Sequence, residues 1–94
     1  FSMSVQAARG KYCCPRMDNA ERYIEVEVGF PSEPEDLLIK YAEDPDQPCD
    51  TVYGYVPSHL ITLVITKHGG MVDGEVPKGV PVSYPFGQNM SLTG

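Results

Sequence analysis

TVYGYVPSHLITLVITK, residues Thr51–Lys67, is the stretch with the longest apolar run and the densest β-branched and aromatic content in this 94-residue chain. Between Leu60 and Thr66 apolar residues and threonines follow one another without a charge, so neither face of an extended segment would be acidic or basic. A strand with two uncharged faces is typical of the middle of a core. The sequence therefore predicts a buried strand over Leu60–Lys67, preceded by another over Thr51–Val56.

A further strand is predicted upstream, over Tyr23–Phe30, where apolar residues alternate with two glutamates and smaller or polar residues. This alternation is typical of a half-buried strand with an acidic outer face. Glu25 and Glu27 would lie on that outer face. The side chains expected to face the core are Ile24, Val26, Val28 and Phe30.

The intervening segment Ser32–Glu43 fits two interpretations. Ser32 followed three residues later by Glu35, with leucines at helical spacing beyond, favours a short helix. Alternating apolar residues from Leu37 to Tyr41 favour a strand instead. A last strand is predicted over Val80–Tyr84, at a sheet edge because Pro81 cannot donate to a ladder.

Together these elements predict one small, mainly β domain over residues 21–84, with a flexible lead-in over 1–20 and a tail over 85–94. If Ser32–Glu43 is a strand, a small β barrel or roll results. If it is a helix, the order of elements suits an α+β roll like that of ubiquitin.

The formal net charge of −6 is unevenly distributed, because eleven of the thirteen acidic residues lie within residues 18–50. An acidic surface repels phosphate groups and attracts basic segments. We therefore expect a protein or peptide partner and neither nucleic acid nor a membrane. No apolar run reaches the 18 or more residues that a membrane-spanning helix needs.

The three cysteines predict free thiols, because their number is odd and Cys13 and Cys14 are adjacent. Free thiols, together with the absence of a signal-peptide pattern, suggest an intracellular protein, cytoplasmic or nuclear. Cysteines and histidines lack zinc-ligand spacing and no phosphate-binding loop is present, so we expect no metal, no cofactor and no enzyme. The enzymatic alternative is a cysteine-dependent one, with Cys49 beside His59 or His68.

Gly54-Tyr55-Val56-Pro57-Ser58-His59-Leu60-Ile61 resembles the closing segment of SH3 domains. In that family a Gly-aromatic-apolar-Pro-Ser-Asn-Tyr-Val run ends one strand, forms a 3₁₀ turn and begins the last strand. The resemblance implies a five-stranded barrel whose groove binds proline-rich peptides, with Pro57 in the groove. It also implies that His59 replaces the ligand-binding Asn and Leu60 the groove Tyr. The chain has no Trp, a residue that walls the groove in SH3 domains.

The sequence thus predicts a non-catalytic interaction module that binds an extended, basic or proline-containing peptide. In an extended strand, Tyr53 and Tyr55 lie on one face and Val52 and Val56 on the other. If the valines fill the core, both tyrosine rings point outward. The alternatives are the cysteine-dependent enzyme and a structural domain of a larger protein without a ligand of its own. The residues expected to bind the peptide are Tyr53, Tyr55, Pro57, His59, Leu60, Glu25 and Glu27.

Overall fold

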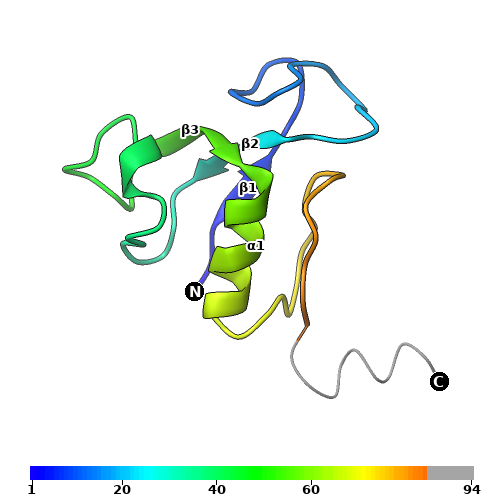
Figure 1. The fold of residues 1–94 in the computed structure, drawn as a ribbon. Helices are drawn as coiled ribbons and strands as arrows, with labels where there is room; N and C mark the ends of the chain where they lie inside the picture. The colour runs from blue at the N-terminus through cyan, green and yellow to red at the C-terminus, as the bar shows by residue number, and fades with distance from the viewer. Residues whose placement is uncertain (85–94) are drawn as a thin grey trace.

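The framework of the computed structural model, which describes residues 1–84, is a three-stranded antiparallel sheet with one α-helix (Figure 1). The strands lie side by side in chain order, β1-β2-β3. A three-stranded antiparallel sheet with one helix is an α+β fold. Because the sheet is open, an SH3-like barrel is not confirmed. The elements are β1 (Ser4–Gln6), β2 (Glu25–Gly29), the 3₁₀ turn η1 (Ile39–Tyr41), β3 (Val52–Pro57) and α1 (Ser58–Lys67).

The central strand β2 lies within the predicted range, and its two valines point into the core as expected. Val26 and Val28 are fully buried, and between them Glu27 faces the other side of the sheet. The prediction was wrong at both ends of the range. Ile24 is 57% exposed and Phe30 is 59% exposed, because the chain leaves the sheet on either side of β2.

A β-bulge in β3 interrupts the alternation on which the orientation of the tyrosines was predicted. Val26 faces Val56 and Val28 faces Tyr53, so two steps along β2 match three steps along β3. The extra residue lies at Tyr55, whose φ of 53° is in the left-handed region. The bulge turns Tyr53 into the core together with Val56, so the expectation of an outward Tyr53 was wrong.

Ser58–Lys67 is the helix α1, and the prediction of a strand over Leu60–Lys67 was wrong. The residues that α1 buries are Ser58, Ile61 and Val64, three apart, which is the spacing of one helix face. Ser58 begins the helix against β2: its N–H donates to the carbonyl of Ile24 and its hydroxyl to that of Tyr23, at 2.9 and 2.6 Å. Sheet contacts therefore outweigh the β-branched composition of the segment.

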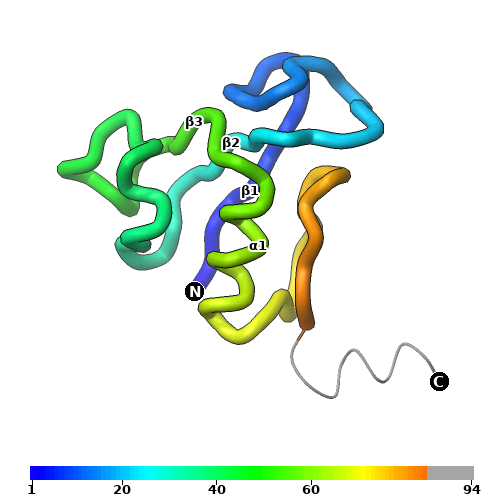
Figure 2. The backbone as a smooth tube through the Cα atoms, in the orientation of Figure 1, coloured from blue at the N-terminus to red at the C-terminus, as the bar shows by residue number. Residues whose placement is uncertain are grey.

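Two other predicted elements differ from the structure. Ser32–Glu43 forms neither the short α-helix nor the strand that were predicted as alternatives; its only helical turn is η1, Ile39–Tyr41. Val80–Tyr84 forms no strand with any of the described residues and runs beside α1 (Figure 2). Side chains of α1 hold it there, because the Thr62 hydroxyl donates to the carbonyl of Pro81 and Thr66 shares a hydrogen bond with Ser83.

Residues 1–20, expected as a flexible lead-in, contribute β1 and a part of the core. Val5 pairs with Val28, and Cys13 is buried, with its thiol directed to the carbonyl of Ala8. The expected tail, residues 85–94, lies outside the described residues. No helix within residues 1–84 has the length and apolar character to cross a membrane. The buried apolar residues are Cys13, Ala20, Tyr23, Val26, Val28, Leu38, Tyr53, Val56, Ile61, Val64 and Val80.

Gly79 allows the segment after α1 to lie directly against the backbone of Tyr23. A Cβ atom at Gly79 would lie 2.7 Å from the Cγ of Arg22 and 2.9 Å from the backbone N and O of Tyr23. We predict that Gly79→Ala lowers the free energy of unfolding by roughly 3 kcal/mol, from backbone strain at positive φ and from overpacking. Gly74 is a matched control, because it also has a positive φ but has open space around it.

Gly74→Ala should therefore cost only about 1–2 kcal/mol, from backbone strain alone. Urea denaturation of the two variants and the original chain measures both effects. Equal losses in the two variants would contradict the close packing of Gly79 on Tyr23.

Candidate functional site

The candidate site lies on the outer face of the sheet, opposite the core. Glu27 points outward from the middle of β2, and its Oε1 accepts a hydrogen bond of 3.2 Å from the backbone N–H of Tyr12. Tyr12 in turn accepts a 2.9 Å hydrogen bond at its carbonyl oxygen from the N–H of Tyr55. The segment before β2 therefore lies across the bulge and satisfies the amide that the bulge turns outward.

Two exposed tyrosine rings result from this arrangement. The rings of Tyr12 and Tyr55 are tilted by 39° with centroids 6.0 Å apart, and the residues are 41% and 43% exposed. Gly54 lets the rings come together, since a Cβ atom there would lie 3.2 Å from the Cβ of Tyr12. We use the name outer patch for Tyr12, Arg16, Glu25, Glu27 and Tyr55.

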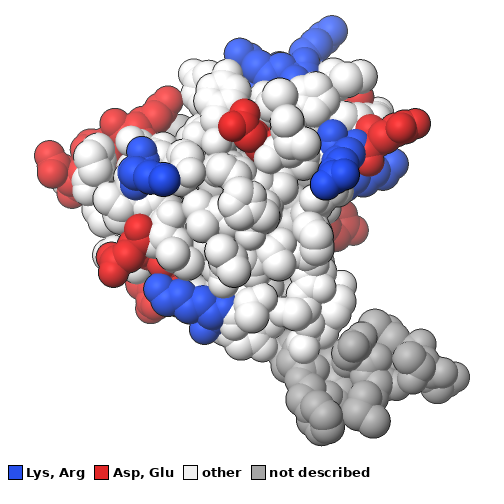
Figure 3. All heavy atoms as spheres, viewed as in Figure 1, with Lys and Arg blue, Asp and Glu red and all other residues white. Residues whose placement is uncertain are grey.

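The outer patch combines aromatic rings with charges of both signs. The guanidinium carbon of Arg16 lies 5.6 Å from the ring centroid of Tyr12, within cation–π range. Glu25 and Glu27 are half-buried on the outer face of β2, and Glu27 accepts the hydrogen bond from the Tyr12 N–H. On the face shown in Figure 3, basic side chains gather over the segment that precedes β2, and acidic ones over the loop between η1 and β3.

Of the residues predicted to bind a peptide, the structure brings Tyr55, Glu25 and Glu27 together on one face. Pro57 is half-buried at the end of β3, opposite Glu25 in the register. His59 is exposed and Leu60 half-buried, both in the first turn of α1 rather than in a strand.

Tyr53 does not belong to this face. Its ring is in the core and its hydroxyl donates to the carbonyl of Pro48. Burial, with a smaller effect of the nearby Cys49, raises the pKa of the Tyr53 phenol. The side chain of Tyr53 is therefore a structural one.

The cysteines are free thiols and show no arrangement with a base. Cys49 is half-buried, and no hydrogen bond within residues 1–84 joins it to His59 or His68. In the same part of the chain, no three His, Cys, Asp or Glu side chains come close enough to hold a metal ion.

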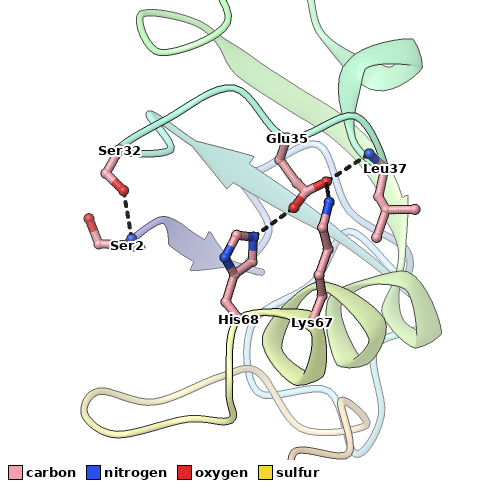
Figure 4. Close-up of polar contacts among 6 residues, drawn as sticks. All are labelled: Ser2, Ser32, Glu35, Leu37, Lys67 and His68. Atoms are coloured by element: carbon pink, nitrogen blue, oxygen red, sulfur yellow. Dashed lines mark hydrogen bonds and ion pairs between the residues drawn. The ribbon is translucent and has the colours of Figure 1, made fainter.

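A second polar cluster, around Glu35, lies where the loop after β2 meets the end of α1 (Figure 4). The Glu35 side chain is 1% exposed and accepts three hydrogen bonds: from Lys67 Nζ at 2.8 Å, His68 Nε2 at 2.7 Å and the N–H of Leu37 at 3.0 Å. The ring of Phe1 stacks on His68 with centroids 4.0 Å apart. The cluster therefore fastens three separate segments to one another.

Hydrogen bonding controls the ionisation of Glu35. Burial by itself would raise the pKa of this carboxyl, but hydrogen bonds from Lys67, Leu37 and His68 outweigh burial and lower the pKa from 4.5 to about 2. The same contact raises the pKa of Lys67. Glu35 is thus a buried, fully ionised acid at neutral pH.

Sequence reasoning missed Tyr12, Arg16 and the partners of Glu35. Tyr12 and Arg16 lie in a segment without periodicity, where no local pattern indicates a contact with β3. Glu35 was noticed only as a possible helix-capping residue. The link from Glu35 to Lys67 and His68 spans more than thirty residues, so only tertiary structure reveals it.

Comparisons with protein-family models, with curated proteins and with solved structures found no significant match to this chain. The outer patch and the Glu35 cluster are therefore interpreted from their own chemistry.

The Glu35 cluster predicts a specific acid sensitivity. A pKa near 2 in the folded chain, against 4.5 for the ordinary carboxyl, means that Glu35 stabilises the fold above pH 4.5 and that this contribution is lost as pH falls towards 2. The contribution at neutral pH is about 3 kcal/mol. Urea denaturation at pH 7 and near pH 2 measures how much free energy of unfolding is lost on acidification. The original chain should lose more than Glu35→Gln does, by roughly the same 3 kcal/mol.

Glu33→Gln is the control, because Glu33 is an exposed carboxylate in the same loop. It should lose as much stability on acidification as the original chain does. If Glu35→Gln also matches the original chain, Glu35 is not the carboxylate that controls this sensitivity.

Proposed function

We propose that this chain is a non-catalytic interaction module whose outer patch binds an extended, basic or proline-containing segment of another protein. The observation that carries the proposal is the backbone of Tyr55. A bulky residue with φ of 53° is disfavoured by roughly 1–2 kcal/mol relative to a glycine. Glycine or asparagine would fit the bulge better, so the fold itself does not require the ring of Tyr55. Phe30 also has a positive φ, but only Tyr55 packs beside a second exposed tyrosine ring.

The second ring supports the same proposal. Two half-exposed tyrosines side by side give a large, rigid apolar area with hydroxyls at its rim, which is typical of protein interfaces. Proline rings and the stems of lysine or arginine pack well on such surfaces. The position of Arg16 over Tyr12 illustrates the affinity of this ring for a cation.

The charges favour a basic ligand. Glu25 and Glu27 lie on the outer face of β2, and Glu27 contacts the backbone of Tyr12. Carboxylates next to an aromatic surface orient a lysine or arginine side chain and increase the rate of encounter. An extended segment presents such side chains alternately, so one can lie on the rings while the next meets a carboxylate.

From the resemblance of Gly54–Ile61 to SH3 domains, this proposal takes only the class of ligand, an extended proline-containing segment. Within that run, Tyr55 belongs to the outer patch, and Pro57 and His59 follow it where β3 passes into α1. The proposed site needs an open sheet with two tyrosines and two acids, and no closed barrel.

The test uses an array of ten-residue peptides containing proline, lysine and arginine, and then measures the affinity of the strongest binder in solution. Tyr55→Asn should weaken binding by about tenfold, as for a moderate interface anchor of 1–2 kcal/mol. Asparagine tolerates positive φ, so relief of strain offsets the lost contact with Tyr12 and stability should change by less than about 1 kcal/mol.

Phe30→Asn is the matched control. Phe30 is also an exposed aromatic residue with positive φ, 49°, but it lies just beyond the end of β2. This variant should bind peptide as the original chain does. Equal losses in both variants, or no loss in Tyr55→Asn, would contradict the proposed site.

Salt should act on association if the acids attract the ligand. Raising the ionic strength from about 0.05 to 0.5 M shortens the screening length and should slow association several-fold, with little change in dissociation. Stopped-flow mixing of the labelled peptide measures both rates. A peptide with its basic residues replaced by glutamine should show no such dependence, and an association rate that is insensitive to salt for the basic peptide would contradict attraction by these carboxylates.

A further inference from the structure

The sheet has an open edge at β1, away from the outer patch. β1 pairs with β2 on one side, and no backbone group within residues 1–84 pairs with its other side. Ser2, just before β1, directs its N–H to the Ser32 hydroxyl and its carbonyl to the Ser32 N–H, on the β2 side. Alternate residues of an antiparallel strand direct their backbone groups to the same side. The backbone groups of Met3, Val5 and Ala7 therefore point to the open edge.

A groove follows this edge along its whole length. One hollow, of about 480 Å³, is bounded by residues 1–5 and 68–76, and a second, of about 440 Å³, by residues 5–8 and 75–78. Val5, Glu75 and Val76 line both hollows, so the two lie next to each other along β1. Unpaired backbone groups thus lie along a groove with room for several residues of extended chain.

The side chains of the groove differ from one end to the other. Between the ends the lining is largely apolar and includes Val5 and Val76. Asp73 lies at the end near Phe1, and Glu75 lies where the two hollows meet. Lys11 and Lys78 lie at the opposite end, in the second hollow.

We infer that this groove binds one extended segment of a partner protein as a fourth strand, antiparallel to β1. Backbone hydrogen bonds to Met3, Val5 and Ala7 would supply affinity, as in other cases of strand addition. An antiparallel strand would begin near Lys11 and Lys78, pass Glu75 and end near Asp73. The partner segment is therefore apolar at alternate positions, acidic near its start and basic near its end.

A second copy of this chain fits the groove less well. Residues 71–78 form a wall beside the open edge, so a second β1 would bring its own wall into the same space. A single strand has no such wall. The inference rests on the edge of β1 and is independent of the function proposed for the outer patch.

The experiment uses the peptide acetyl-EVTVTVK-amide as the probe and follows amide hydrogen exchange by NMR at low salt. Saturating probe should slow exchange at Val5, and at Met3 and Ala7, by at least tenfold, with little change at Ser4 and Gln6. The peptide with exchanged ends, acetyl-KVTVTVE-amide, should bind at least threefold more weakly. Asp73→Lys combined with Glu75→Lys should remove this preference.

N-methylation of alternate amides in the probe should abolish the protection, a test that leaves the protein unchanged. Tyr55→Asn should bind the probe as the original chain does. The inference is overturned if 1 mM probe leaves exchange at Val5 unchanged, if the N-methylated probe protects equally well, or if protection of Val5 depends on protein concentration and accompanies a dimer.

Discussion

The β-bulge at Tyr55 is the constraint on which the arrangement of this sheet depends. It shifts the register by one residue, so that Tyr53 and Val56 both face the core although they are three positions apart. Without the extra residue, one of them would face solvent and the core would lose a fully buried side chain. The same residue turns its amide outward to Tyr12, and this contact draws the segment before β2 across the outer face. The bulge therefore determines both which side chains of β3 enter the core and which segment covers the outer face.

The buried carboxylate of Glu35 fixes the position of the end of α1 against the loop that follows β2. A buried ionised acid is tolerated only when hydrogen bonds compensate for its lost hydration, and Glu35 obtains three of them. Two come from the last turn of α1 and the residue after it, so α1 is tied to the loop that follows β2. Ser58 ties the first turn of α1 to Tyr23 and Ile24, just before β2, in a similar way. The helix is thus held at both ends by polar contacts and along its length by apolar ones.

The sequence allowed prediction of β2 and β3 as strands, because both are rich in β-branched and aromatic residues. Alternation agrees with the structure in β2 but fails in β3, where the bulge turns Tyr53 into the core. The sequence did not allow prediction of α1, since the run from Leu60 to Thr66 has the composition of a strand. The spacing of Ser58, Ile61 and Val64 was the signal for a helix, but composition concealed it. Tyr55 and the two glutamates of β2 lie on the outer face, as strand alternation predicted, and their role as a binding site stays a prediction. Tyr12 could not be predicted, because its place depends on the bulge.

Each of the two proposed surfaces includes a feature that makes the fold less stable than it could be. Such features are not confined to these surfaces, since Phe30 also has a positive φ and α1 forms from a segment with the composition of a strand. At Tyr55 the backbone would be more stable with a smaller residue. At β1 the edge has neither the proline nor the charged residues that usually prevent strands from pairing with other chains. Residues 71–78 lie beside this edge instead. If the groove binds a partner strand as inferred, this wall admits one strand and excludes a bulkier neighbour. Charged residues on an edge strand oppose pairing with any other strand. A wall beside the edge would oppose pairing with a second copy of the chain and still allow a single partner strand to bind.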